Sequence, residues 1–296
     1  MKNKPIAIVT GATNGMGQLV ALELAKKGMD IGFTARSLEK AKVTKQLIHA
    51  VAPQSDVKVF MSDFTVLKDV QRTGKEIADT YDHIDVLINN AGVHAFEQRV
   101  TADGFSEMIQ VNYLAPWILT NMLRKTLVAS GKARVVTVAS EASKRHGTFS
   151  IPFDLTNTAA FGMRESSELY GKTKLLDIMF CLELAHQLKD TSVTSNCLNP
   201  GFNVTGLGRD LKFAGPLEKI LTKLHVGDPS KGAGIIVALA TNADLEKKTG
   251  RYYSGKELTE LVPSHPADSE ASRQQLWERT GALLAEHGIK NLIQGA

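Results

Sequence analysis

A tyrosine and a lysine that lie one helical turn apart are the residues of this sequence best suited to chemistry. Tyr170 and Lys174 form a Tyr-x-x-x-Lys pattern, and residues four apart on a helix share one face. An ammonium group beside a phenol favours the phenolate, so we expect Lys174 to lower the pKa of Tyr170 from its usual value of about 10. Tyr170 would then exchange a proton near neutral pH. Alone, such a pair also fits a solvated helix face.

A glycine-rich turn near the start of the chain is the second candidate site. Residues 4–10 predict a short apolar strand and residues 16–27 an amphipathic helix. The backbone amides and the helix N-terminus of such a turn can approach the pyrophosphate of a dinucleotide. The spacing differs from Gly-x-Gly-x-x-Gly, and an ordinary tight connection explains it equally well. The residues of this candidate site are Gly11, Thr13, Asn14, Gly15, Met16 and Gly17.

Strands and helices alternate along the chain and would position both groups. Repeated βα units build a parallel sheet that is covered on both faces, and ligands bind at the carboxyl ends of its strands. We therefore expect an α/β fold, a Rossmann-type doubly wound parallel seven-stranded sheet with helices on both faces, in a single domain over residues 1–296. The predicted strands are 6–10, 30–34, 57–61, 84–89, 134–139, 192–198 and 252–254, and the later helices 38–50, 66–81, 104–130, 167–188 and 230–241.

Six motifs, in this order, resemble the short-chain dehydrogenase/reductase family. They are the turn at 10–17, Asn89-Asn90-Ala91-Gly92, Asn112, Ser140, Tyr170 with Lys174, and Pro200-Gly201. The resemblance runs over nearly the whole chain. Segments 229–233 and 250–254 are similar to the retinol dehydrogenase and carbonyl reductase branch. The resemblance implies an NAD(P)-dependent enzyme that interconverts carbonyls and alcohols.

The resemblance implies a catalytic role for Asn112, Ser140, Tyr170 and Lys174. Tyr170 would protonate the carbonyl oxygen while hydride arrives from the nicotinamide, and Lys174 would also hold the nicotinamide ribose. Ser140 would donate a hydrogen bond to the substrate carbonyl; it also fits a cap of the next segment, and Ser143 is a nearby rival. Asn112 would bend its helix and hold a water that relays protons to the lysine.

Other residues are assigned to the cofactor by the same resemblance. Asp63 resembles an adenine-contacting aspartate, although a helix cap is an alternative interpretation. Asn203 departs from the family pattern, which usually has an apolar residue there. Asn90, Ala91 and Gly92 would line the cleft beside the ribose. Pro200 and Gly201 would bend the chain around the nicotinamide, and Thr205 would bind the carboxamide or pyrophosphate.

Two residues after the second predicted strand indicate which dinucleotide is bound. Enzymes selective for NADH commonly place an acid here to bind the ribose hydroxyls. This segment has none, and Arg36, followed by Ser37, offers a forked cation to a phosphate. We therefore expect NADPH or NADP+ as cofactor, with NADH the less favoured choice.

An insertion at about 144–168 and a lobe at about 202–228 would form the substrate side. With Val93, His94 and Phe96 they suggest an apolar pocket with a polar rim. We expect reversible reduction of a ketone or aldehyde on a lipophilic substrate. A regulatory or sensor protein that binds a cofactor with the same fold is the alternative, although such relatives tend to lose the tyrosine or lysine. The apolar residues of the insertion are Phe149, Ile151, Phe153, Leu155, Phe161 and Met163.

Composition sets the remaining expectations. The net charge of +4 is spread along the 296 residues, which argues against nucleic acid as a partner. The histidines show no metal-binding spacing, and Cys181 and Cys197 fit reduced core thiols. With the first strand close to residue 1 and no apolar run of membrane-spanning length, we expect a cytoplasmic protein without a membrane anchor. Family members pair through helices equivalent to 104–130 and 167–188; since the insertion could cover that surface, we expect a monomer or weak homodimer.

Overall fold

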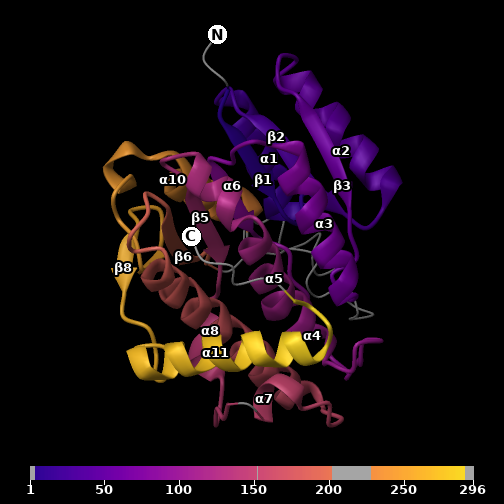
Figure 1. The fold of residues 1–296 in the computed structure, drawn as a ribbon, viewed down its shortest axis with the longest axis vertical. Helices are drawn as coiled ribbons and strands as arrows, with labels where there is room; N and C mark the ends of the chain where they lie inside the picture. Colours follow the sequence, from indigo (N-terminus) through magenta and orange to yellow (C-terminus); the bar gives the residue numbers. More distant parts are fainter. Residues whose placement is uncertain (1–3, 152, 202–227, 291–296) are drawn as a thin grey trace.

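One eight-stranded sheet runs through the part of the chain that the computed structural model describes, residues 4–151, 153–201 and 228–290 (Figure 1). Its strands are β1 (Ile6–Val9), β2 (Asp30–Ala35), β3 (Val57–Met61), β4 (Val86–Asn89), β5 (Arg134–Val138), β6 (Thr194–Asn199), β7 (Arg251–Ser254) and β8 (Thr259–Leu261). They lie in the order β3-β2-β1-β4-β5-β6-β7-β8, and all pairs are parallel except β7 with β8. The predicted Rossmann-type parallel sheet is confirmed. The prediction of seven strands missed β8, a three-residue antiparallel edge strand with polar residues.

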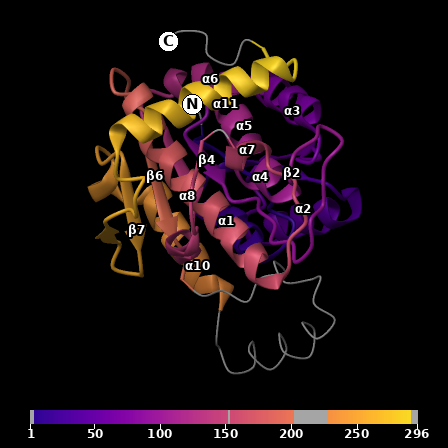
Figure 2. The ribbon, with the colours of Figure 1, turned by 90° about the horizontal axis from the view of Figure 1, so that it is seen from below.

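Helices cover both faces of the sheet (Figures 1 and 2). The helices α1, α2 and α10 pack on one face, and α3, α5, α8 and α11 contribute to the core on the other. Their bounds are α1 (Gly15–Lys26), α2 (Leu38–Val51), α3 (Leu67–Thr80), α4 (Glu107–Ile109), the π-helix η1 (Gln110–Leu114), α5 (Ala115–Met122), α6 (Arg124–Ala129), the 3-10 helix η2 (Glu141–Arg145), α7 (Phe153–Thr156), α8 (Met163–Gln187), α10 (Pro229–Thr241), the 3-10 helix η4 (Ala243–Leu245) and α11 (Glu270–Glu286).

All four residues of β1 and the first three of β4 are apolar, because both faces of these central strands are buried. In β1, Ile8 packs with the core on the α5 and α8 side, whereas Ala7 and Val9 pack with the core on the α1 side. β4 repeats this alternation with Leu87 on the α5 side and Ile88 on the α1 side. Alternate side chains of a strand point to opposite faces, so a continuous apolar run marks a strand covered by helices on both faces.

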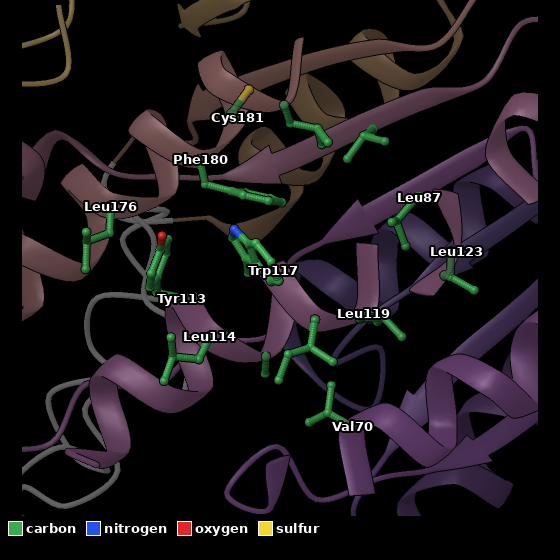
Figure 3. Close-up of a cluster of buried hydrophobic side chains, with 14 of the residues drawn as sticks. Val70, Leu87, Tyr113, Leu114, Trp117, Leu119, Leu123, Leu176, Phe180 and Cys181 are labelled. Atoms are coloured by element: carbon green, nitrogen blue, oxygen red, sulfur yellow. The ribbon is translucent and has the colours of Figure 1, made fainter. Parts of the chain in front are cut away.

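Aromatic side chains join α5, α8 and α11 behind the sheet. Trp117 of α5 and Phe180 of α8 lie side by side in the centre of this core (Figure 3). Trp277 of α11 packs on both: its ring centroid lies 5.1 Å from that of Trp117 and 6.0 Å from that of Phe180. Nearby, the hydroxyls of Tyr113 and Thr280 are hydrogen bonded at 2.6 Å. These contacts hold α11 across the two long helical segments of the chain (Figure 1).

Two helical predictions need correction. The helix expected at 104–130 is divided into α4, η1, α5 and α6, since a π-helix interrupts it around Asn112. The long helix α11 was not predicted; it turns only a narrow set of side chains to the core, and its remaining residues are mostly polar. No helix within the described ranges combines the length and apolar character needed to cross a membrane.

Candidate active site

A cavity of about 460 Å³ opens at the carboxyl ends of β1 to β4. This is where the strand order reverses, between β1 and β4, and open α/β sheets bind their ligands at such a point. The structure therefore brings together segments predicted to bind the cofactor, although they are far apart in the sequence. Of those residues, Gly11, Thr13, Asn14, Gly15, Met16, Gly17, Arg36, Ser37, Asp63, Asn90, Ala91 and Gly92 line this cavity.

The glycine turn has the geometry that its residue types require. Gly11 and Gly15 have φ angles of +68° and +55°, a left-handed conformation that residues with a Cβ rarely adopt. Gly17 lies so close to its neighbours that a Cβ there would meet Asn90 Nδ2 at 2.4 Å and Gly11 O at 2.5 Å. The turn thus brings the N-terminus of α1 to the cavity, as expected of a cradle for a pyrophosphate.

Hydrogen bonds of Thr10 join the start of the glycine turn to the loop after β4. The Thr10 hydroxyl accepts from the backbone N–H of Asn90 at 2.9 Å and of Ala91 at 3.0 Å, and donates to Ile88 O. The Asn90 side chain donates back to Thr10 O at 2.9 Å. Asn90 therefore shapes the floor of the cavity by joining the ends of β1 and β4.

Two cations lie at the outer end of the cavity, beyond β2. Arg36 is exposed and lines the cavity, as predicted from its place in the sequence. Lys40, in the first turn of α2, lines it as well. Ser37 caps this helix by accepting a hydrogen bond from the Lys40 N–H. Lys40 was not predicted; its signal in the sequence was a second cation close after Arg36, in the first turn of a capped helix.

Asp63 lines the same cavity and also closes a local turn with its side chain. Its Oδ1 accepts hydrogen bonds from the Thr65 N–H at 2.9 Å and from the Thr65 hydroxyl at 2.8 Å. The carboxylate thus holds the turn before α3, but it does not cap that helix, whose N-cap residue is Val66. The contact of Asp63 with the adenine remains a prediction, and the residue borders the cavity.

Asn112 lies in the π-helix, where the sequence predicted a distortion. Its Oδ1 accepts from Val93 N–H at 2.8 Å, and its Nδ2 donates to Val93 O at 2.9 Å and to the Thr173 hydroxyl at 3.0 Å. Both N–H groups of the amide and its oxygen thus fasten the loop after β4 to α8. π-Helical turns inside α-helices are frequent at functional sites.

Ser140 and Tyr170 approach the site from β5 and from α8. Ser140 follows the end of β5 and caps η2, since its Oγ accepts a hydrogen bond from Ala142 N–H at 3.2 Å. A Cβ on Gly171 would meet Ala142 O at 2.6 Å and Arg145 O at 2.9 Å. The missing side chain at Gly171 thus lets η2 lie directly on the helix turn that carries Tyr170.

Lys174 is almost completely buried and has two fixed partners. Its Nζ donates to Val138 O at 2.9 Å and to Asp177 Oδ2 at 2.8 Å, and lies 5.8 Å from the centre of the Tyr170 ring. Burial opposes the charged form, but Asp177 and Tyr170 outweigh it and raise the pKa of Lys174. Lys174 therefore stays protonated at neutral pH.

The expected net effect on Tyr170 was wrong in direction. Burial raises the pKa of Tyr170, Lys174 lowers it, and Asp177 raises it again; the net shift is upward. The spacing of Tyr170 and Lys174 predicted their attraction, but not the burial of the phenol nor the nearby carboxylate. Tyr170 therefore keeps its proton at neutral pH.

A histidine forms part of the wall beside the phenol. The His94 ring stacks on the Tyr170 ring with centroids 4.4 Å apart. His94 also packs on Phe96, with ring centroids 4.6 Å apart. His94 Nε2 lies 3.1 Å from the Ser166 hydroxyl, and burial lowers the pKa of His94. Sequence analysis placed His94 in the pocket wall but did not predict its contact with Tyr170.

The substrate side is described in part. Pro200 and Gly201 follow β6 as predicted, whereas Asn203, Thr205 and most of the lobe at 202–228 lie outside the described residues. The described insertion residues do not form a wholly apolar wall. Leu155 joins the core, Met163 is exposed, and a second cavity of about 200 Å³ beside the insertion has many polar residues in its lining.

The close packing of Gly17 leads to a stability prediction. We expect Gly17→Ala to lower the free energy of unfolding by about 1–3 kcal/mol, because the added methyl group must push apart the glycine turn and the Asn90 side chain. Gly234 in α10 is the matched control, since a Cβ there meets nothing within 4 Å. Gly234→Ala should raise the stability by up to about 1 kcal/mol. Urea unfolding measures both; equal effects would contradict the packing argument.

Comparison with known proteins assigns this site to a family. A family model described as short chain dehydrogenase matches residues 5–154. Retinol dehydrogenase 13 of Mus musculus is 32% identical over 94% of this chain and 83% of its own. A protein of Streptomyces sp. (strain C5), provisionally named a daunorubicin C-13 ketoreductase, is 30% identical over 94% of this chain and 92% of its own.

Solved structures share the fold. A protein of Escherichia coli CFT073, assigned to the short-chain dehydrogenases and crystallised with NADPH, superposes with a TM-score of 0.66 at 22% identity, covering 85% of this chain and 96% of its own. The sequence matches and the arrangement of the cavity agree, and they show that this chain belongs to the short-chain dehydrogenase/reductase family and is an NAD(P)-dependent oxidoreductase.

Proposed function

We propose that the protein uses NADPH to reduce a ketone or aldehyde on a lipophilic substrate, reversibly, with Tyr170 as the proton donor. The observation that carries this proposal is the position of Tyr170 beside the buried ammonium of Lys174, on the helix that packs against the Ser140 turn. The bound nicotinamide would supply the hydride. An enzyme is favoured over a regulatory role because the chain carries Ser140, Tyr170 and Lys174, whereas regulatory relatives tend to lose the tyrosine or lysine.

Each of these side chains has a group available for the reaction. The Tyr170 phenol keeps its proton at neutral pH, as a general acid must. The ammonium of Lys174 has three N–H groups, of which two bind Val138 O and Asp177 Oδ2. The third would bind a ribose hydroxyl of the cofactor. Ser140 Oγ accepts from the backbone, so its O–H would donate to the substrate carbonyl oxygen.

The preference for NADPH rests on charge at the outer end of the cavity. Arg36 and Lys40 both line it there, and the residues between Thr34 and Lys40 that line it include no acid. A phosphate on the adenosine ribose would be bound by two cations, and a guanidinium fits phosphate oxygens with two parallel hydrogen bonds. The related E. coli structure contains NADPH, which supports the same choice.

The lipophilic substrate is proposed from the aromatic wall of the site. Phe96, His94 and Tyr170 form a continuous row of packed rings from the loop after β4 to α8. Such a row would hold an apolar body beside the phenol. The relatives named as a retinol dehydrogenase and a ketoreductase are consistent with this class of substrate.

We also propose that residues 1–296 act as one domain and as a monomer or weak homodimer. Family members commonly pair through the two long helical segments represented here by α4 to α6 and by α8. The helix α11 packs on both segments, since Trp277 contacts Trp117 of α5 and Phe180 of α8. A second chain would have to displace this helix to pair in the common way.

Removal of the Tyr170 hydroxyl tests the chemistry. Tyr170→Phe should lower kcat for carbonyl reduction by at least about a hundredfold, because the general acid is lost. The Kd for NADPH should change little, since the ring and Lys174 remain. Assays of NADPH absorbance with a panel of apolar aldehydes and ketones measure the first effect, and fluorescence titration the second. A variant that keeps most of its kcat would rule out the assignment.

The cations at the cavity test the cofactor preference. Loss of a charge-assisted hydrogen bond costs about 1.5–3 kcal/mol, so Arg36→Ala should weaken NADPH binding by roughly ten- to a hundredfold and leave NADH binding nearly unchanged. Lys40→Ala should act in the same direction with a smaller effect. Lys45→Ala, on the same helix but outside the cavity lining, is the matched control. Equal losses for NADPH and NADH would contradict recognition of the phosphate.

The position of α11 tests the assembly. Light scattering at micromolar concentration should give the mass of one chain, 32.1 kDa, or a mixture that approaches this value on dilution. A tetramer that persists on dilution would show that another surface pairs, or that α11 moves away from α5 and α8.

A further inference from the structure

A carboxylate lies inside the active-site helix where neither the cofactor nor the substrate is expected to need one. Asp177 is fully buried, three residues after Lys174 on α8, and its Oδ2 accepts the hydrogen bond from Lys174 Nζ at 2.8 Å. Its Oδ1 has no hydrogen-bond partner among the described residues. A buried carboxylate with one partner is costly unless the partner carries the opposite charge.

The titratable groups that face Asp177 come from three elements. Lys174 and Tyr170 are on α8 itself, Tyr113 is on η1, and Cys197 is on β6, beside Cys181 of α8. The negative charge of Asp177 helps raise the pKa of each of the two phenols, of Lys174 and of the Cys197 thiol. At neutral pH the phenols and this thiol are uncharged, so Lys174 and Asp177 form an ion pair within a neutral surrounding.

We infer that Asp177 is a positioning residue of the active site: as the counter-ion of Lys174 it holds the ammonium in place and, in addition to burial, favours the protonated form of Tyr170. The inference rests on the proposed roles of Tyr170 and Lys174. With Asp177 ionised, the group of Tyr170, Lys174 and Asp177 is neutral, and loss of a proton makes it an anion. Without that carboxylate the group would be a cation, from which a proton leaves at lower pH.

This arrangement suits one half of the reaction. Lys174 favours the phenolate, which accepts a proton from an alcohol, but burial of the phenol outweighs this effect. Asp177 adds to the effect of burial, and together they keep Tyr170 in the form that donates a proton to a carbonyl. Burial raises the pKa of Asp177 to about 6. Below that pH the carboxylate takes up a proton, and its contribution to keeping the proton on Tyr170 is lost.

The test compares Asp177→Asn with a matched variant. Asp154→Asn removes another buried carboxylate, which binds Lys172 Nζ at 2.6 Å on the same helix but is not among the groups that act on Tyr170. On the alkaline side, kcat/KM for carbonyl reduction falls as pH rises. In Asp177→Asn the midpoint of this fall should lie about one pH unit or more below that of the wild type. In Asp154→Asn this alkaline midpoint should equal that of the wild type.

Two readings without turnover accompany this profile. Phenolate absorbance of the cofactor-free protein, taken as the difference from Tyr170→Phe, reports a proton lost from Tyr170. The Kd for NADPH as a function of pH reports a proton lost from Lys174. In Asp177→Asn at least one of these transitions should move to lower pH by about one unit or more. Neither should move in Asp154→Asn.

The outcomes separate this inference from the proposed function. If Asp177→Asn is folded by circular dichroism and none of the three profiles moves, Asp177 has a structural role only and the inference is wrong. If Asp177→Asn does not fold, the phenolate titration of the wild type is the test. A pKa of Tyr170 below the usual tyrosine value of about 10 would overturn the inference. If Tyr170→Phe retains activity, the proposed function fails, while the phenolate titration still reports on Asp177.

Discussion

The burial of a single cation, the ammonium of Lys174, is the constraint on which the rest of the active site depends. A charge in the interior must be matched by polar partners, and these are the carbonyl at the end of β5 and the carboxylate of Asp177. The helix α8 must therefore lie tightly against β5 and η2, which the missing side chain at Gly171 permits. Asn112 adds a connection from η1 through Thr173. The same contacts therefore determine both how α8 packs and where Lys174 and Tyr170 lie.

The cofactor side is built on a different principle, the close approach of two backbone segments. Thr10 and Asn90 exchange hydrogen bonds across the junction of β1 and β4. Gly11 and Gly17 allow this approach because neither has a side chain. The floor of the cavity consequently consists of backbone and short polar groups, whereas the side chains that distinguish one dinucleotide from another lie at its outer end.

Features that depend on local spacing could be predicted from the sequence, and features that depend on packing could not. The strands, the glycine turn and the positions of Tyr170, Lys174 and Ser140 follow from periodicity, motif order and family resemblance. The upward pKa shift of Tyr170 was missed because burial is not visible in a four-residue interval. The contact of His94 with Tyr170 and the place of α11 were missed for the same reason, since each joins segments distant in sequence. Thr205 remains a prediction outside the described residues.

The long interval between α8 and α11 has a consequence for biosynthesis. The ribosome makes residues of α11 well after those of α8, since 82 residues, 188–269, lie between the two helices. Until then Phe180 and Trp117 lack their contact with Trp277. Exposed apolar surface on a nascent chain invites aggregation. A paused or shortened translation product would therefore carry every catalytic side chain and still expose the apolar back of its catalytic helix to chaperones.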